Sequence, residues 1–196
     1  MRLFQLSLLA TAILVSTPAA WGAELTFLER SFSAHTQRPV GAVVLLQGDI
    51  VEGDAMRLAT LLSQLEDYEG GFQEAGVRLI LNSPGGNYAE GLRIGRLVRE
   101  KGIGTTVPAG VHCYSACAIA FMHGTVHLDG EKWLNRKLDP GGRLGFHAPY
   151  LDLPPDMETT PETVATAYAA ALYAISDLIE SAQTIFSEEL LMKMLR

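Results

Sequence analysis

One serine in the chain stands where a nucleophile for acyl transfer is expected. Ser115 is the middle residue of the segment CYSAC at 113–117, where a polar stretch changes into an Ala-rich one. A serine at a turn from a strand into a helix exposes its Oγ, and the N–H of the next residue, Ala116, can bind an oxygen that becomes negative. His147, which follows the apolar segment LGF, is a base that can accept the serine proton. A serine and a histidine that meet in space can cleave an acyl bond.

A pair of glycines supplies the second requirement, which is a site for negative charge. Gly85 and Gly86 follow Ser83-Pro84 at the end of a predicted strand and precede a predicted helix. Glycines at such a turn expose backbone N–H groups beside a helix N-terminus, and this arrangement binds anions. Each motif alone also has an ordinary interpretation, because Pro-Gly-Gly is a common turn, serine is a common N-cap, and a lone histidine at a strand end is more often structural.

The elements that must position these residues alternate between strands and helices. Continuous β-branched and aliphatic runs predict buried strands, and apolar residues at helical spacing predict amphipathic helices. Asp54 is expected to cap the first helix and Gly102 to end the second. The alternation predicts a single α/β domain. The predicted strands are 40–46, 77–81, 103–107 and 125–128, and the predicted helices are about 54–65, 88–101, 112–122 and 162–182, with a last one from about 187.

Three regions are expected to lack regular structure. They are a polar lead-in at 24–39, a charged surface loop at 129–143 and a Pro-rich linker at 149–161. The predicted organisation is therefore a leader at 1–22, a lead-in at 23–39 and an α/β domain at 40–196.

Taken in order, the motifs resemble those of one family. The segment NSPGG at 82–86, a helix, a strand, a serine flanked by small residues and a histidine after a strand are arranged as in the ClpP class of serine peptidases, within the ClpP/crotonase superfamily. The segment LQGDI at 46–50 also looks like the end of that family's first strand. The resemblance covers about residues 40–150, and the surroundings of Ser115 are most similar to exported, bacterial ClpP-like proteins.

The resemblance implies a repeated ββα spiral fold and a Ser–His mechanism that needs neither a cofactor nor a metal. Ser115 would be the nucleophile and His147 the general base. The N–H groups of Ala116 and of Gly86 or Gly85 would form the oxyanion hole. Members commonly assemble into rings or trimers, so a homo-oligomer that acts on a peptide or acyl substrate is expected.

The third member of the catalytic triad departs from the family pattern. The family takes an Asp from beyond the long helix that follows the histidine, and here no Asp follows Asp177, which lies inside that helix. Asp177 is our first candidate for the acid. The alternatives are a backbone carbonyl that orients His147, an acid beyond Arg196 in a longer chain, and a catalytically inactive member of the family that serves as a binding or assembly module.

The two cysteines have three possible states. Cys113 and Cys117 are the only cysteines in the chain, and in an exported protein pairing is the default expectation. Free buried thiols are one alternative. A zinc site is the other, because Cys-x3-Cys is flanked by His112, His123 and His127, although Gly124 is expected to interrupt the helical spacing of the last two histidines.

The N-terminus predicts export. Arg2 precedes an apolar run from Leu3 to Val15, and Ala20-Trp21-Gly22 is a small-x-small cleavage pattern. Cleavage after Gly22 is expected, and Ala19 is a second possible site. The run is shorter than a membrane span of about 20 residues needs, so an uncleaved anchor is the lesser alternative. We therefore expect a periplasmic protein.

That compartment and the composition exclude several partners. ATP and coenzyme A are cytoplasmic, so neither an ATP-dependent unfoldase nor a crotonase-type thioester substrate is expected. The net charge of −7, with no cluster of basic residues, argues against nucleic acid.

Overall fold

The computed structural model describes residues 22–32, 39–65, 76–148, 158–182 and 185–194. The predicted leader therefore lies almost wholly outside the described residues. The elements in chain order are β1 (Glu24–Phe32), β2 (Pro39–Gln47), α1 (Asp54–Ser63), β3 (Gly76–Asn82), α2 (Tyr88–Lys101), β4 (Gly104–Val107), β5 (His112–Tyr114), α3 (Ala116–Met122), β6 (Thr125–Leu128), β7 (Glu131–Leu134), β8 (Arg136–Leu138), β9 (Arg143–Gly145), α4 (Pro161–Ala182) and α5 (Glu188–Met194).

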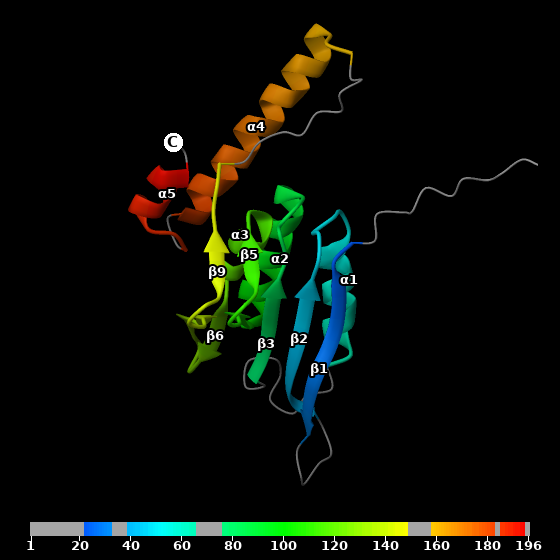
Figure 1. Cartoon of the computed structure of the whole chain (residues 1–196), viewed down its shortest axis with the longest axis vertical. Helices are drawn as coiled ribbons and strands as arrows, with labels where there is room; N and C mark the ends of the chain where they lie inside the picture. Colours follow the sequence, from blue (N-terminus) through cyan, green and yellow to red (C-terminus); the bar gives the residue numbers. More distant parts are fainter. Residues whose placement is uncertain (1–21, 33–38, 66–75, 149–157, 183–184, 195–196) are drawn as a thin grey trace, which may run out of the picture.

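A five-stranded sheet in the order β1-β2-β3-β4-β8 is the centre of the molecule (Figure 1). Strands β2, β3, β4 and β8 run parallel, and β1 pairs antiparallel with β2. Helices α1, α2 and α3 contribute their apolar residues to the same core as β2 and β3. The α/β class predicted from the alternation of strands and helices is confirmed.

Most predicted elements occur where the patterns place them. The helix predicted at 88–101 is α2, and Gly102 ends it in the left-handed conformation with a φ of 67°. Buried apolar residues alternate along β3, which packs between two parallel neighbours. Periodicity identified α2, whereas β3 was identified by its continuous apolar run and is fully buried only at alternate residues.

Two regions predicted to lack structure form strands. The lead-in contains β1, in which Leu25 and Phe27 alternate with more polar residues and pack against the core. The loop predicted at 129–143 contains β7, β8 and the start of β9. Asp129 and Gly130 have φ angles of 52° and 79° and join β6 to β7 as an Asp-Gly hairpin. The charged composition predicted a loop because β7 is exposed along its whole length and so carries no apolar pattern typical of a buried strand.

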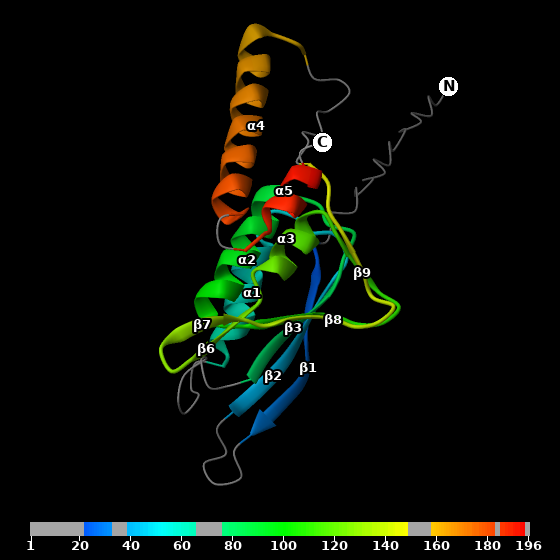
Figure 2. The ribbon, with the colours of Figure 1, turned by 90° about the vertical axis from the view of Figure 1, so that its left-hand side faces the viewer.

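Helix α4 projects away from the sheet (Figures 1 and 2). Its C-terminal half is attached to α2, where the hydroxyl of Tyr88 donates to the carbonyl oxygen of Ala174 at 3.0 Å and Arg96 pairs with Asp177 at 3.3 Å. Burial, together with the charge of Asp177, raises the pKa of Tyr88, so its hydroxyl stays a donor. Exposed apolar side chains nevertheless line one stripe of α4, namely Val164, Tyr168, Leu172, Ile175 and Ile179.

Within the part of the chain that the structure describes, no helix is both long and apolar enough to cross a bilayer.

The pH dependence of stability is set in part by His123, which ends α3 inside the protein. Its side chain is 2% exposed, and its Nδ1–H donates to the carbonyl oxygen of Ile119 at 2.8 Å. Burial lowers the pKa of His123 to about 4. The neutral imidazole is thus the form that the fold requires.

We expect the protein to lose stability as the pH falls from about 6.5 to about 4. Over this range the unfolded chain binds a proton that folded His123 does not, so the unfolded state is favoured by about 3 kcal/mol at the lower end. The measurement is urea unfolding across this range. His123→Leu should flatten the slope, whereas His112→Asn should retain it. An unchanged slope in His123→Leu would assign the effect to other groups.

Candidate functional site

Ser115 occupies a strained turn between β5 and α3. Its φ and ψ are 55° and −125°, and Asp129 is the other non-glycine residue with a positive φ among the described residues. Such a conformation costs about 1–3 kcal/mol and persists only when the surrounding structure enforces it. Nucleophilic serines of hydrolases stand on turns of this kind, at the step from a strand into a helix. The helix predicted over 112–122 is shorter than expected, because His112–Tyr114 form strand β5 and Ser115 is the turn between β5 and α3.

Backbone hydrogen bonds enforce this turn from both sides. The N–H of Ser115 donates to the carbonyl oxygen of Gly145 at 2.9 Å, and β5 pairs in parallel with β9. On the other side, Tyr114 donates to the carbonyl oxygen of Ser83 at 3.0 Å, and Ser83 donates to that of His112 at 2.9 Å. The serine is thus held between the segment that ends β3 and the segment that carries the histidine.

A disulfide closes across the same turn. Cys113 and Cys117 are bonded, are fully buried and have Cα atoms 5.2 Å apart, so the predicted pairing is confirmed. The bond removes both thiolates from the alternative zinc site. His123 and His127 each hydrogen-bond a backbone carbonyl oxygen, and the described residues contain no group of three or more potential metal ligands.

Two glycines are packed directly against the turn. Gly85 has a φ of +105°, and a Cβ atom on it would lie 2.6 Å from Cβ of Ser115 and 2.6 Å from the carbonyl oxygen of Tyr114. Gly86 has a φ of +134°, and a Cβ atom there would collide with the carbonyl oxygen of Ile50. Both positions therefore require glycine, for the backbone angle and for the space.

Of the backbone N–H groups near Ser115, some donate a hydrogen bond within the described structure and others do not. The N–H of Gly85 donates to Oγ of Ser83 at 3.0 Å. The N–H groups of Gly86 and Ala116 have no acceptor among the described residues. The position of a Cβ atom on Gly85 is 3.2 Å from the nitrogen of Ala116, so the two unoccupied donors flank the contact between Gly85 and Ser115. Of the predicted oxyanion-hole residues, Gly86 and Ala116 have donors to offer, and Gly85 provides the close approach.

Ser83 is a positioning residue that the sequence analysis did not identify. Its side chain is fully buried, and its Oγ binds the N–H of Gly85, which fixes the start of the glycine pair. The signal was a serine two residues before a glycine, since a serine hydroxyl often bonds a backbone N–H two residues on.

His147 follows β9 and is exposed. Gly145 is hydrogen-bonded to Ser115, and two peptide units span at most about 7 Å, so the backbone of His147 lies close to the turn. The Nδ1–H donates to the carbonyl oxygen of Ala148 at 2.7 Å, which leaves the lone pair of the neutral ring on Nε2. A direct contact between Nε2 and the serine hydroxyl stays a prediction.

Asp177 is the predicted acid of the triad, a role that stays a prediction. It lies on α4, and its carboxylate pairs with Arg96 of α2. The structure gives it a partner at the contact between these helices, and no contact with His147 is among its described interactions. The catalytic mechanism that we propose assigns no step to Asp177.

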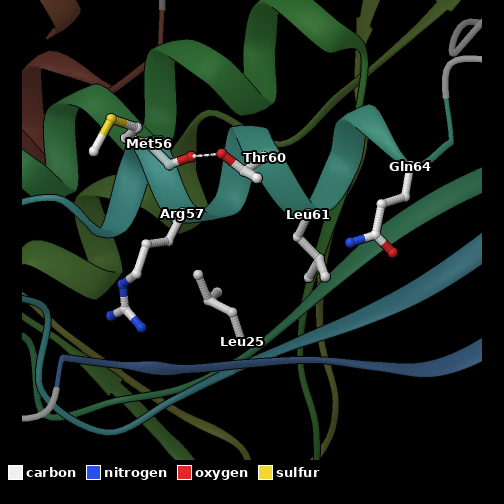
Figure 3. A pocket seen from close by; sticks show the side chains of 6 residues that line it. All are labelled: Leu25, Met56, Arg57, Thr60, Leu61 and Gln64. Carbon is white, nitrogen blue, oxygen red and sulfur yellow. Dashed lines mark hydrogen bonds between the residues drawn. The ribbon is translucent and has the colours of Figure 1, made fainter.

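The groove drawn in Figure 3 is separate from the serine turn. It lies between β1 and α1 and is lined by Leu25, Met56, Arg57, Thr60, Leu61 and Gln64. None of these residues belongs to the segments around Ser115. The lining of the groove includes no serine, cysteine, histidine or carboxylate that could act as a nucleophile or a base. We assign no chemistry to the groove.

Comparisons with protein-family models and with curated proteins find no match for this chain, so the inference of function depends on the geometry described above.

Proposed function

We propose that this protein is an exported serine hydrolase of the ClpP/crotonase type that cleaves peptide or other acyl bonds. The observation that carries the proposal is the strained conformation of Ser115, between β5 and α3, against a glycine pair that tolerates no side chain. Strain of this kind needs compensation from the rest of the fold, and active sites are where it is commonly found. The spiral fold of that superfamily is part of the proposal.

The mechanism begins with attack of Ser115 Oγ on the carbonyl carbon of the substrate, while Nε2 of His147 takes the hydroxyl proton. The carbonyl oxygen becomes negative and receives hydrogen bonds from the N–H groups of Gly86 and Ala116. Each such donor contributes about 3–4 kcal/mol to stabilising the transition state. The tetrahedral intermediate collapses, the imidazolium returns its proton to the leaving group, and water then releases the acyl group by the same steps.

The orientation of His147 requires no carboxylate in this mechanism. A bond from Nδ1–H to a backbone carbonyl oxygen selects the tautomer with a basic Nε2, and the bond to Ala148 supplies that orientation. A carbonyl stabilises the imidazolium less than a carboxylate does, so a slower enzyme is expected than one with a complete triad.

A second candidate is a binding or assembly module that has the fold without catalysis. The pairing of Asp177 with Arg96 favours it, because the predicted acid is engaged elsewhere. The two candidates differ in whether Ser115 reacts with an electrophile that requires an activated hydroxyl.

Export is supported by the disulfide, since such bonds persist in oxidising compartments. A homo-oligomer is supported by the exposed apolar stripe of α4, which a second copy of the chain would cover.

A fluorophosphonate probe should label the oxidised protein at Ser115, because only an activated serine reacts with it. Ser115→Ala should abolish labelling, and Ser187→Ala, at an exposed serine before α5, should not. Mass spectrometry of the labelled peptide identifies the site. If folded protein remains unlabelled at all probe concentrations, the binding-module candidate is favoured.

Gly85→Ala should lower the labelling rate about 100-fold or more, since its Cβ would occupy the space of Ser115 and displace the donors. Gly110→Ala is the matched control: Gly110 also has a positive φ, +80°, but a Cβ atom there meets nothing within 4 Å. The control isolates backbone strain from crowding, so equal losses in both variants would contradict a role for the glycine pair at the serine.

Removing the disulfide should affect reactivity more than stability. The bond closes a loop of only five residues, which stabilises the fold by at most about 2 kcal/mol through chain entropy. Relaxation of the strained Ser115 turn would lower labelling about tenfold or more. The double substitution Cys113→Ala with Cys117→Ala, compared by thermal unfolding and labelling rate, tests this. Unchanged labelling in the folded variant would show that the hydrogen bonds alone enforce the turn.

Substituting the α4 stripe should prevent assembly without unfolding the monomer. Tyr168→Glu combined with Leu172→Glu places two charges on exposed apolar positions, 66% and 49% accessible. We expect light scattering to report a smaller species than for the unchanged chain. Ala169→Glu, exposed on another side of α4, is the control. A monomeric unchanged chain would contradict the predicted homo-oligomer.

A further inference from the structure

The first amide after the predicted cleavage site is buried against a carboxylate. Ala23 is fully buried, and its N–H donates to Oδ2 of Asp54 at 3.0 Å. Asp54 is itself fully buried. Cleavage after Gly22 would make this nitrogen the N-terminus of the processed chain, so the predicted new terminus and a buried acid are already in hydrogen-bonding contact.

Asp54 has a different role from the helix cap that its position predicted. Gly53 occupies the cap, Asp54 is the first residue of α1, and the first-turn N–H of Ala55 donates to Oε1 of Glu90 at 2.7 Å. The Asp54 carboxylate instead accepts from the N–H of Val51 at 3.0 Å and pairs with Arg57. Arg57 also donates to the carbonyl oxygen of Ala23 at 3.0 Å and reaches from α1 toward β1 in Figure 3. One carboxylate thus joins the start of β1, the segment before α1 and α1 itself.

The same segment supports the glycine pair at the serine turn. Ile50, next to Val51, is buried, and its N–H donates to the carbonyl oxygen of Gly85 at 2.7 Å. Its own carbonyl oxygen accepts from Asn87 at 2.8 Å, so Ile50 forms a bridge opposite Gly86. A direct chain of contacts therefore leads from the nitrogen of Ala23 through Asp54, Val51 and Ile50 to the proposed oxyanion hole.

Gly22 fills the space around this contact in the unprocessed chain. A Cβ atom on Gly22 would collide with Nη2 of Arg57, Oδ1 of Asp54 and Cγ2 of Val51. Its removal leaves room beside the carboxylate for the extra hydrogens of an amino group. Arg57 is the other cation at the site, and because its side chain is 47% exposed, water screens its repulsion of a new positive charge.

We propose that Asp54 is the binding site for the α-ammonium of the processed chain, and that this ion pair fixes the support of the oxyanion hole. Water cleaves the Gly22–Ala23 bond: its oxygen joins the carbonyl carbon of Gly22, which leaves as the carboxylate of the leader, and its two protons end on the nitrogen of Ala23. The neutral amide donor becomes a charged donor to a buried carboxylate, and such bonds are about twice as strong as neutral ones. The inference rests on the proposed export, and it makes Asp54 a positioning residue for the site.

The test compares two forms of the chain that begins at Ala23, one with a free amine and one that is N-acetylated. The acetyl group matches the carbonyl and Cα of Gly22, so the forms differ in charge and little in shape. We expect the free amine to raise Tm by about 4 °C. Hydrogen exchange of the amides at 50–51 and 85–87 should slow by about tenfold in that form.

Asp54→Asn should remove both differences, because an amide side chain cannot pair with the ammonium. Arg57→Met supplies a second variant that leaves Asp54 in place. It should lower Tm more in the acetylated form, where Arg57 is the carboxylate's one cation, than in the free form. Equal Tm and equal exchange in the two unsubstituted forms would overturn the proposal, as would a difference that persists with Asp54→Asn.

These readouts do not depend on catalysis. If fluorophosphonate labelling fails while the free amine still stabilises 50–51 and 85–87, the hydrolase assignment is wrong and the ion pair stands. If labelling succeeds equally in the free and acetylated forms, and Tm and exchange also agree between them, the ion pair is wrong and the hydrolase assignment stands. N-terminal sequencing of protein exported with its leader should begin at Ala23, and a start before Gly22 would contradict the proposal.

Discussion

The left-handed backbone of Ser115 is the constraint on which the site depends. A residue with a Cβ atom adopts a positive φ only at a cost, and the cost is met here by bonds to the ends of two strands and by the disulfide. The parallel sheet brings the end of β3 to this place, and the glycine pair follows that strand at once. The close approach of Gly85 to Ser115 is therefore a product of the sheet's topology, and local sequence alone does not produce it.

Much of this arrangement was predictable because its elements are regular. The central strand β3 carries a continuous apolar run, α2 carries apolar residues at the spacing of their burial, and Gly102 ends α2 as expected. The segments NSPGG and CYSAC predict turns, because the backbone and side-chain preferences of glycine, proline and serine act locally. The pairing of the two cysteines followed from their number and from the predicted export. In each case the signal and the structure that it predicts lie within a few residues.

What could not be predicted depends on contacts between distant segments. Strand β1 is short of apolar residues because one side of it is largely exposed, and its place is set by pairing with β2. Asp54 appeared to be a cap, since no local pattern shows that Ala23 would reach it. Asp177 was chosen as the candidate acid from its position along the chain, and no local pattern shows that its carboxylate pairs with Arg96 of α2. The partner of a charged residue depends on which distant segments the fold brings next to it. The role of such a residue is therefore hard to predict from sequence.

The two glycines are required by different neighbours, and this separation has a mechanical consequence. Gly85 is confined by Ser115, whereas Gly86 is confined by Ile50, so the pair is clamped between the serine turn and the segment that precedes α1. A displacement of Ile50 is thus transmitted to Gly86, whose N–H has no acceptor in the described part of the chain to resist it. Donors that point at a developing charge must stay unoccupied in the resting protein, and they cannot be fixed by bonds of their own. Their position must be enforced by the residues on either side, and in the proposed oxyanion hole Ile50 and Ser83 are those residues.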